Sequence, residues 1–242
     1  MDKEYIIMAP PYAKNNGIKV HYLLYSHLRA RGQKVRICAP PPHQEGFDYI
    51  EPEEITAEVR KNSIAVYSEI IWGNPLHMDS VVRYVLYYPG VIGGSKEYDP
   101  SEFIVTYHPD FYPSAFKLTI PCIDTTVFYD DHSEKKQDCY FVHKYGKFRE
   151  VPELEGAVEI NMQYPATQKE LADLLRTTKT LYSFDPHTVV AAEATRCGAK
   201  VKFITPTGFM DYQDNYDEVI SDFEVQMEKF IKISQSRSGV RC

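Results

Sequence analysis

Residues 4–40 read EYIIMAPPYAKNNGIKVHYLLYSHLRARGQKVRICAP, and the pattern of this stretch indicates the fold class. The apolar run at 4–10 closes on proline and predicts a β-strand. Residues 18–32 carry apolar side chains at helical spacing, have basic residues near their end and stop at Gly32, so they predict an α-helix. Residues 33–40 predict a second strand. A strand–helix–strand unit implies two parallel strands joined by a right-handed crossover.

The same alternation continues along the chain. It predicts further strands at 62–71, 102–108, 117–124, 138–146, 156–162, 180–184 and 199–205. It predicts further helices at 75–90, 167–179, about 186–197 and 215–234. We therefore expect an α/β fold with two Rossmann-like, doubly wound parallel-sheet domains that face a cleft.

A polar, aperiodic stretch divides this pattern. Residues 125–137 are charged and lack any apolar period, which predicts a linker. The expected domains are therefore 1–124 and 138–242. Whether the terminal helix crosses back to the first domain is left open.

The bulk composition excludes several classes of protein. The net charge of −7 and the absence of a basic patch argue against a nucleic-acid partner. The five cysteines form no C-x-x-C pair, so we expect small buried residues in a reducing compartment. We expect no signal peptide and no transmembrane segment, which predicts a cytoplasmic protein.

The stretch SFDPHTVVAAEATRCGAKV, at 183–201, carries the candidate chemistry. Asp185-Pro186 predicts a helix start and Gly198 a helix stop, about 12 residues apart. Eight residues of helical rise would separate Asp185 from Glu193 by about 12 Å, roughly the span from a sugar across a diphosphate to a ribose. The alternative is that Asp185 only caps the helix and Glu193 faces solvent.

This stretch resembles the E-x7-E element of the retaining GT-B glycosyltransferases of family 4, with Asp185 in place of the first glutamate. Residues 67–90, YSEIIWGNPLHMDSVVRYVLYYPG, are similar to a segment of some bacterial and viral members. The chain length is similar to that of the compact members encoded by large algal viruses. The resemblance would place a virus-encoded protein in the host cytoplasm.

The resemblance implies a set of site residues. Asp185 and Lys144 would be catalytic. The donor would be held by Gly17, Lys144, Lys147, Asn161, Met162, His187, Thr188, Val189 and Glu193. Asn16 and His108 are candidates on the acceptor side. The two lysines are equally readable as solvated turn residues, and Gly17 as a turn glycine with positive φ. We expect no metal site and no cofactor.

The function implied is metal-independent, retaining transfer of a hexose, with mannose the first choice. The donor would be a GDP- or UDP-linked sugar and the acceptor a glycan or glycoprotein hydroxyl. Two alternatives stay open: a nucleotide-sugar 2-epimerase and a non-catalytic nucleotide-sugar-binding module. The sequence does not decide whether the chain forms a homodimer.

Overall fold

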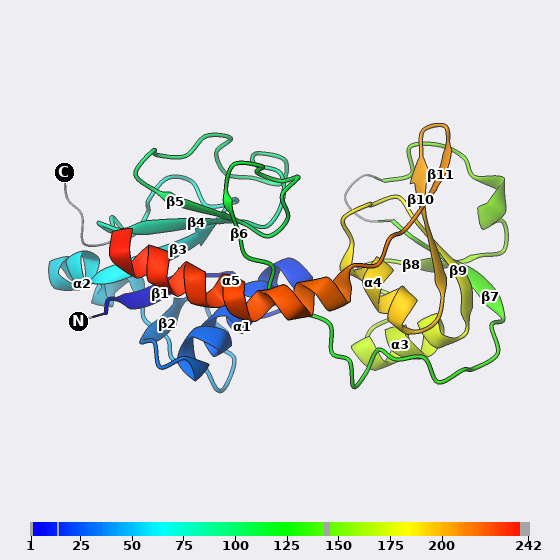
Figure 1. Ribbon diagram of the computed structural model, residues 1–242, viewed down its shortest axis with the longest axis horizontal. Coiled ribbons are helices and arrows are strands. Elements are labelled where there is room, and N and C mark those ends of the chain that lie inside the picture. The colour runs from blue at the N-terminus through cyan, green and yellow to red at the C-terminus, as the bar shows by residue number, and fades with distance from the viewer. Residues whose placement is uncertain (1, 14, 143–145, 238–242) are drawn as a thin grey trace. The chain divides into compact units, whose positions relative to one another are not determined.

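The computed structural model describes residues 2–13, 15–142 and 146–237 (Figure 1). The chain is an α/β protein with two parallel-sheet domains. Unit 1 comprises residues 1–122 and 218–242, and unit 2 comprises residues 123–217. The second unit is therefore an insertion between two segments of the first. No described helix has the length and apolar character needed to cross a membrane.

Unit 1 contains a six-stranded sheet in the order β2-β1-β3-β4-β5-β6, with every neighbouring pair parallel. Its strands are β1 (Glu4–Met8), β2 (Val35–Cys38), β3 (Ser63–Ser68), β4 (Val81–Val85), β5 (Phe103–Thr106) and β6 (Phe116–Lys117). Its helices are α1 (Asn16–Ala30), the 3₁₀ turn η1 (Pro52–Glu54), α2 (Ala57–Asn62) and α5 (Tyr216–Arg237), of which the first two residues fall in unit 2.

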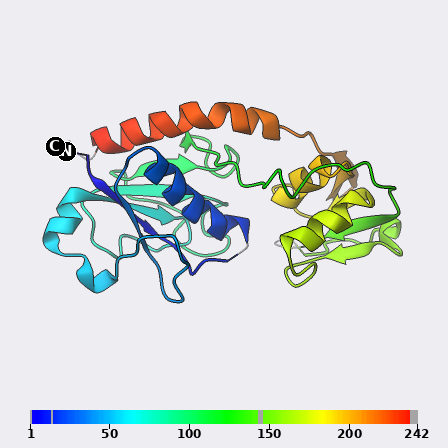
Figure 2. The same ribbon diagram turned by 90° about the horizontal axis from the view of Figure 1, so that it is seen from below.

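The two faces of this sheet are covered differently. The helices α1 and α5 share one apolar cluster with the strands, and Figure 2 shows both helices beside the sheet. Phe223, Met227 and Phe230 are the buried contribution of α5. On the opposite face, Tyr67 packs with loop residues such as Leu76 and with α2. The apolar stripe of α5 is thus buried against strands that precede it by more than a hundred residues.

The helix predicted at 75–90 is wrong, because this segment contains β4. The strand is buried along most of its length, so its sequence lacks the alternation of apolar and polar residues that marks a half-exposed strand. Its continuous apolar run is compatible with the period of a helix as well as with that of a strand. Arg83 of this strand is 1% exposed and pairs with Glu102 through Nε and Oε2 at 2.8 Å. The strand predicted at 117–124 is also shorter than expected, since β6 ends at Lys117.

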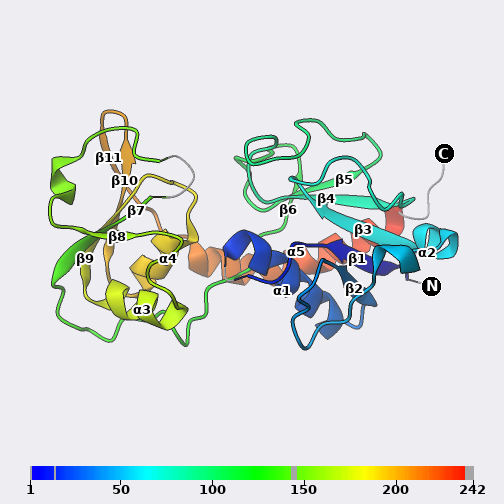
Figure 3. The ribbon, with the colours of Figure 1, turned by 180° about the vertical axis from the view of Figure 1, so that it is seen from behind.

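Unit 2 contains a five-stranded sheet in the order β11-β10-β9-β7-β8. Its strands are β7 (Gln137–Phe141), β8 (Val158–Ile160), β9 (Thr178–Ser183), β10 (Lys200–Thr205) and β11 (Gly208–Asp211), and only β11 is antiparallel to its neighbour. Its helices are the 3₁₀ turn η2 (Pro152–Leu154), α3 (Gln168–Arg176) and α4 (Val189–Arg196). Figure 3 shows α3 and α4 side by side.

The two sheets repeat one topology. Counted within each unit, the second strand, the first, the third and the fourth lie in that spatial order. The chain therefore moves to one side of its first strand and then to the other. In unit 2 this reversal lies between β7 and β9. Parallel sheets of this kind bind ligands beyond the carboxyl ends of the strands at the reversal.

The helix predicted to start at Asp185-Pro186 starts three residues later. Thr188 is the N-cap, and its hydroxyl accepts from the Val190 N–H at 3.2 Å. Asp185 instead closes a turn, since its Oδ1 accepts from the His187 N–H at 2.9 Å. Aspartate is favoured both at helix N-caps and in turns, so its presence at position 185 is compatible with either structure.

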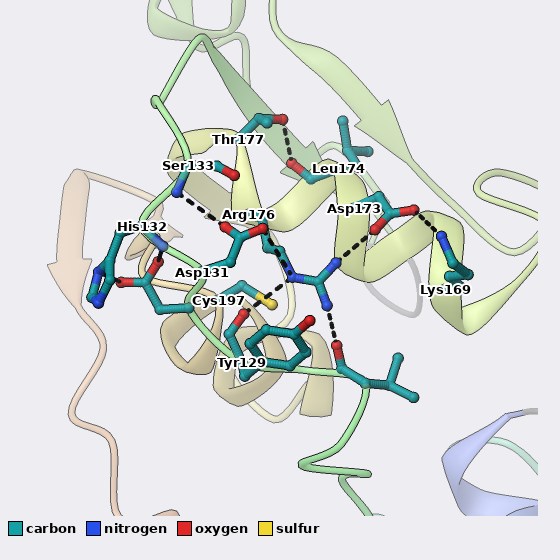
Figure 4. Close-up of polar contacts among 12 residues, drawn as sticks. Tyr129, Asp131, His132, Ser133, Lys169, Asp173, Leu174, Arg176, Thr177 and Cys197 are labelled. Carbon is teal, nitrogen blue, oxygen red and sulfur yellow. Dashed lines mark hydrogen bonds and ion pairs between the residues drawn. The ribbon is translucent and has the colours of Figure 1, made fainter.

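The polar stretch predicted as a linker makes specific contacts with unit 2 (Figure 4). The Arg176 guanidinium donates to the carbonyl oxygens of Val127 at 2.5 Å and Tyr129 at 3.2 Å. It also pairs with Asp131 and with Asp173 on its own helix. One nearly buried arginine thus fixes a segment without regular structure onto α3. The expected domain boundaries stay a prediction.

The described cysteines fit the sequence expectation. Cys38, Cys122, Cys139 and Cys197 are all buried. Burial raises the pKa of the Cys38 and Cys197 thiols to about 11, so these groups stay protonated at neutral pH.

Candidate functional site

A cavity of about 390 Å³ lies at the strand reversal of unit 2, and we call it the switch-point pocket. Its lining includes Tyr140, Lys147, Arg149, Glu150, Glu155 and Phe184. Tyr140 belongs to the end of β7, and Phe184 directly follows β9. The pocket therefore lies where the topology predicts a ligand, and its volume is within the range of small-molecule sites.

A polar network joins Tyr140, Lys147 and Glu159 at this pocket. Lys147 Nζ donates to Tyr140 Oη at 3.0 Å, and Tyr140 Oη donates to Glu159 Oε2 at 2.5 Å. Lys147 also lies over the Tyr140 ring, 4.4 Å from its centroid. The hydrogen bond with Tyr140 raises the pKa of Lys147 and lowers the pKa of Glu159. Lys147 is therefore a fixed cation beside the pocket.

A second cation of the pocket, Arg149, is anchored more firmly. Its guanidinium donates to the carbonyl oxygens of Thr205 at 2.8 Å and Gly208 at 2.9 Å, at the two ends of the β10–β11 turn. It also stacks on Phe209 at 5.3 Å. These bonds hold the positive charge in place, so a bound anion would meet it without a further cost in side-chain entropy.

The aromatic wall of the pocket is equally fixed. Phe184 is buried, and its N–H donates to the Phe141 carbonyl at 3.2 Å. Phe148 packs edge-on against it at 5.3 Å and is 46% exposed. Aromatic faces of this kind stack on bases and on the CH faces of sugars.

The predicted residues of the β9–α4 loop directly follow Phe184 in the chain. Asp185 is 1% exposed, and its Oδ1 accepts from its own loop at the His187 N–H. Thr188 caps α4 and Val189 opens it. Within the described part of the chain, Asp185 shares no hydrogen bond or ion pair with Lys147. The two predicted halves of the donor site are therefore not joined by a polar contact.

Glu193 is buried in α4, with 3% of its surface exposed. The alternative that it faces solvent is wrong. Its position among Ala191, Ala192 and Ala194 explains why, because this face of the short helix packs against the sheet. Its predicted contact with a ribose stays a prediction.

Three predicted residues of unit 2 remain: Lys144, Asn161 and Met162. Lys144 lies outside the described residues. Asn161 follows β8, donates from Nδ2 to Glu159 Oε1 at 3.3 Å, and accepts from the Gln163 N–H at 2.9 Å. It therefore joins the Lys147 network. Met162 is 56% exposed beside it.

The other predicted residues, Asn16, Gly17 and His108, belong to unit 1. Asn16 and Gly17 form the first turn of α1, as expected, and the N-cap is Asn15. Gly17 does not have a positive φ, so its interpretation as a turn glycine is wrong. His108 follows β5, its Nδ1 accepts from the Asp110 N–H at 3.3 Å, and its ring contacts Phe111.

Sequence reasoning missed Tyr140, Arg149, Glu159 and Phe184. A signal for two of them was present. Tyr140 and Glu159 are directly opposite in the parallel pairing of β7 and β8, Tyr140 carries a hydroxyl within an apolar run, and Glu159 interrupts one. Polar groups at matched positions of neighbouring strands can meet on one face of a sheet. Arg149 and Phe184 gave no comparable pattern.

No family model matches the chain, and no curated protein matches it. One matching solved structure is a periplasmic binding protein/LacI transcriptional regulator from Alkaliphilus metalliredigens QYMF, complexed with D-xylulofuranose. It has 11% identity and a TM-score of 0.31, and the match covers 95% of this chain and 91% of that one. This likeness is too weak to indicate what the present chain binds.

The expected membership of glycosyltransferase family 4 is corrected by these comparisons. The matching structure is a periplasmic binding protein/LacI regulator and not a GT-B glycosyltransferase. The assignments that depended on that family fall with it: GT-B architecture, retaining hexose transfer, a GDP-mannose donor and a viral origin. The motif on which they rested is also altered in the structure, since the segment from Asp185 to Thr188 precedes α4 and is not helical.

Proposed function

We propose that unit 2 is a nucleotide-sugar-binding module. The observation that carries this proposal is the switch-point pocket, where two anchored cations and the Tyr140 ring line a cavity at the strand reversal between β7 and β9. The expectation that the chain is an enzyme stays a prediction, and binding does not require it.

Each part of such a ligand has a complementary group in the pocket. Lys147 and Arg149 offer positive charge to a diphosphate. The Tyr140 ring, which is only partly buried, offers apolar surface to a base or a sugar ring. The carboxylates of Glu150 and Glu155 can accept hydrogen bonds from ribose or sugar hydroxyls, which are donors. The same carboxylates disfavour a ligand that carries only negative charge.

Calorimetry on the full chain tests the proposal. The probes are UDP-glucose, GDP-mannose and ADP-glucose, together with UDP, GDP and glucose alone. We expect at least one nucleotide sugar to bind more tightly than its nucleoside diphosphate and than glucose. Failure of all three nucleotide sugars to bind the folded protein would overturn the proposal.

A matched pair of variants places the binding in the pocket. Lys147→Met removes the exposed pocket cation and should weaken binding by about tenfold, which corresponds to about 1.4 kcal/mol. Lys179→Met changes an exposed lysine of β9 away from the pocket lining and should leave affinity unchanged. Equal effects of the two substitutions would show that the ligand binds elsewhere.

A further inference from the structure

A second cavity, of about 470 Å³, lies within unit 1. We call it the β4–β5 pocket, because two loops at the carboxyl ends of those strands form it. Pro89 and Lys96 follow β4, whereas Phe111, Tyr112, Pro113 and Ser114 follow β5. None of these residues belongs to the site predicted from the sequence or to the switch-point pocket.

The wall contributed by the second loop is held in place by its own hydrogen bonds. The Phe111 N–H donates to the His108 carbonyl at 3.0 Å, and the Ala115 N–H donates to the Tyr112 carbonyl at 3.1 Å across Pro113. Thr106 Oγ1 donates to the His108 carbonyl at 2.7 Å. A ligand would therefore meet a preformed turn, and little ordering cost would be subtracted from its affinity.

An aromatic cluster supports the floor of this pocket. Phe111 is 6% exposed and packs against Tyr87 at 5.3 Å and Tyr88 at 5.0 Å. Tyr112 is half-buried and lies 6.0 Å from Tyr98. The cluster leaves Tyr112 as the accessible ring, flanked by Pro113.

Lys96 gives the pocket a positive charge. Its side chain lies against the backbone at Gly90, where an added Cβ would be 2.6 Å from Lys96 Cγ. Within the described residues, Lys96 makes no ion pair. The neighbouring acids Glu97 and Asp110 do not line the cavity. An unpaired ammonium group is a point charge that suits a single carboxylate or phosphate group.

We propose that the β4–β5 pocket binds an anionic saccharide, that is, a sugar ring bearing one carboxylate or phosphate. The CH face of the ring packs on Tyr112 and the prolines, the hydroxyls of Tyr112 and Ser114 hydrogen-bond to sugar hydroxyls, and Lys96 pairs with the anionic group. A neutral sugar or a proline-rich peptide would use the apolar wall but leave Lys96 without a partner.

Three ligands with the same ring separate these cases: D-glucose, D-glucuronate and D-glucose 6-phosphate. Binding to the full chain is measured by calorimetry and by amide chemical shifts in NMR spectra. We expect at least one of the two anionic sugars to bind about tenfold or more tightly than glucose, with shifts centred on Lys96, Tyr112 and Ser114. Which of the two binds identifies carboxylate or phosphate as the preferred group.

Two variants test the role of the charge. Lys96→Met should abolish the preference for the anionic sugars, whereas Lys61→Met, on the exposed surface of α2, should preserve it. Lys147→Met in unit 2 should also leave it unchanged, so this test is independent of the proposed nucleotide-sugar site. The proposal would be overturned if glucose bound as tightly as the anionic sugars, if none of the sugars bound, or if Lys96→Met kept the preference for the anionic sugars. Binding of a neutral proline-rich peptide to the pocket, with no binding of the sugars, would also overturn it.

Discussion

His21 is a histidine that the fold keeps neutral. It is 2% exposed on the buried side of α1, and its Nδ1 lies 2.9 Å from the Gly17 carbonyl oxygen. Burial lowers the pKa of His21 to about 4. Its ordinary pKa is about 6.5, so the unfolded chain takes up this proton before the folded chain does.

The pKa of His21 predicts a pH dependence of stability. Its contribution is fully present above about pH 6.5 and is lost as the pH falls from there to about 4, by up to about 1.4 kcal/mol per pH unit. Carboxylates titrate in the same range, so the informative quantity is the difference between the native chain and His21→Gln. Urea unfolding at several pH values gives the free energy of unfolding as a function of pH. Between about pH 4 and 6.5 this free energy should change less steeply with pH in the variant, and identical slopes would contradict the pKa assigned to His21.

Gly94 is required for a close approach of two loops. Its φ is +71°, and an added Cβ would lie 1.8 Å from the Glu69 carbonyl oxygen. Gly46 has a φ of +86° but no atom within 4 Å of its Cβ position. Gly46→Ala should therefore lower the free energy of unfolding by about 1 kcal/mol, the cost of strain alone.

Gly94→Ala should cost several times as much, because a backbone oxygen cannot move as a flexible side chain can. Thermal unfolding of the two variants measures the difference. Similar melting temperatures would mean that the loops do not pack as described.

The element most instructive about prediction from sequence is β4. Its apolar run was predicted to belong to a helix over 75–90, yet the segment is a strand, and the guanidinium of its Arg83 is buried and fully engaged in hydrogen bonds. It donates to both oxygens of Glu102 and to the carbonyl oxygens of Ser68, Ile71 and Gly73. The partners of Arg83 are distant in sequence, so no local sequence pattern predicts these contacts.

Removing Arg83 should destabilise unit 1 strongly. Arg83→Met leaves Glu102 buried without its partner and should cost about 3–5 kcal/mol. The double variant Arg83→Met/Glu102→Met should lose less than the sum of the two single variants, since neither charge is then left unpaired. Denaturant unfolding of the three variants completes the cycle, and strict additivity would refute the pairing.

The α/β class, the βαβ start and most strands of unit 2 were predictable because apolar period and turn residues are local signals. The start of α4 was not predictable from the sequence. Asp185 in the turn and Thr188 at the N-cap both accept a hydrogen bond from the backbone N–H two residues later. Of the switch-point pocket, only Lys147 was anticipated. Its Tyr140 and Glu159 partners meet through strand pairing, which is a non-local feature.

At the scale of the whole chain, unit 1 is built from two separated segments. Phe223, Met227 and Phe230 of α5 complete an apolar cluster whose other members lie before residue 121. Further contacts tie the helix to the first strand, including the Tyr5 Oη to Ser234 Oγ hydrogen bond at 2.7 Å. Unit 2, by contrast, is continuous from 123 to 217.

These contacts predict unequal effects of truncation. A chain ending at residue 217 should retain a folded unit 2 but lose the cooperative unfolding of unit 1, because the apolar face under α5 would be exposed. Amide NMR spectra can resolve the two units separately. The full chain is the control, and a dispersed unit 1 spectrum after truncation would contradict this expectation.

The insertion of unit 2 has a consequence for synthesis. As the ribosome releases the polypeptide, the strands of unit 1 emerge first but lack the helix that covers them, whereas residues 123–217 emerge as one uninterrupted stretch. Domains generally fold as units while the chain is being made. Unit 1, whose strands are translated before unit 2, should therefore finish folding after it. The apolar face that α5 later covers is where a nascent-chain chaperone would bind in the interval.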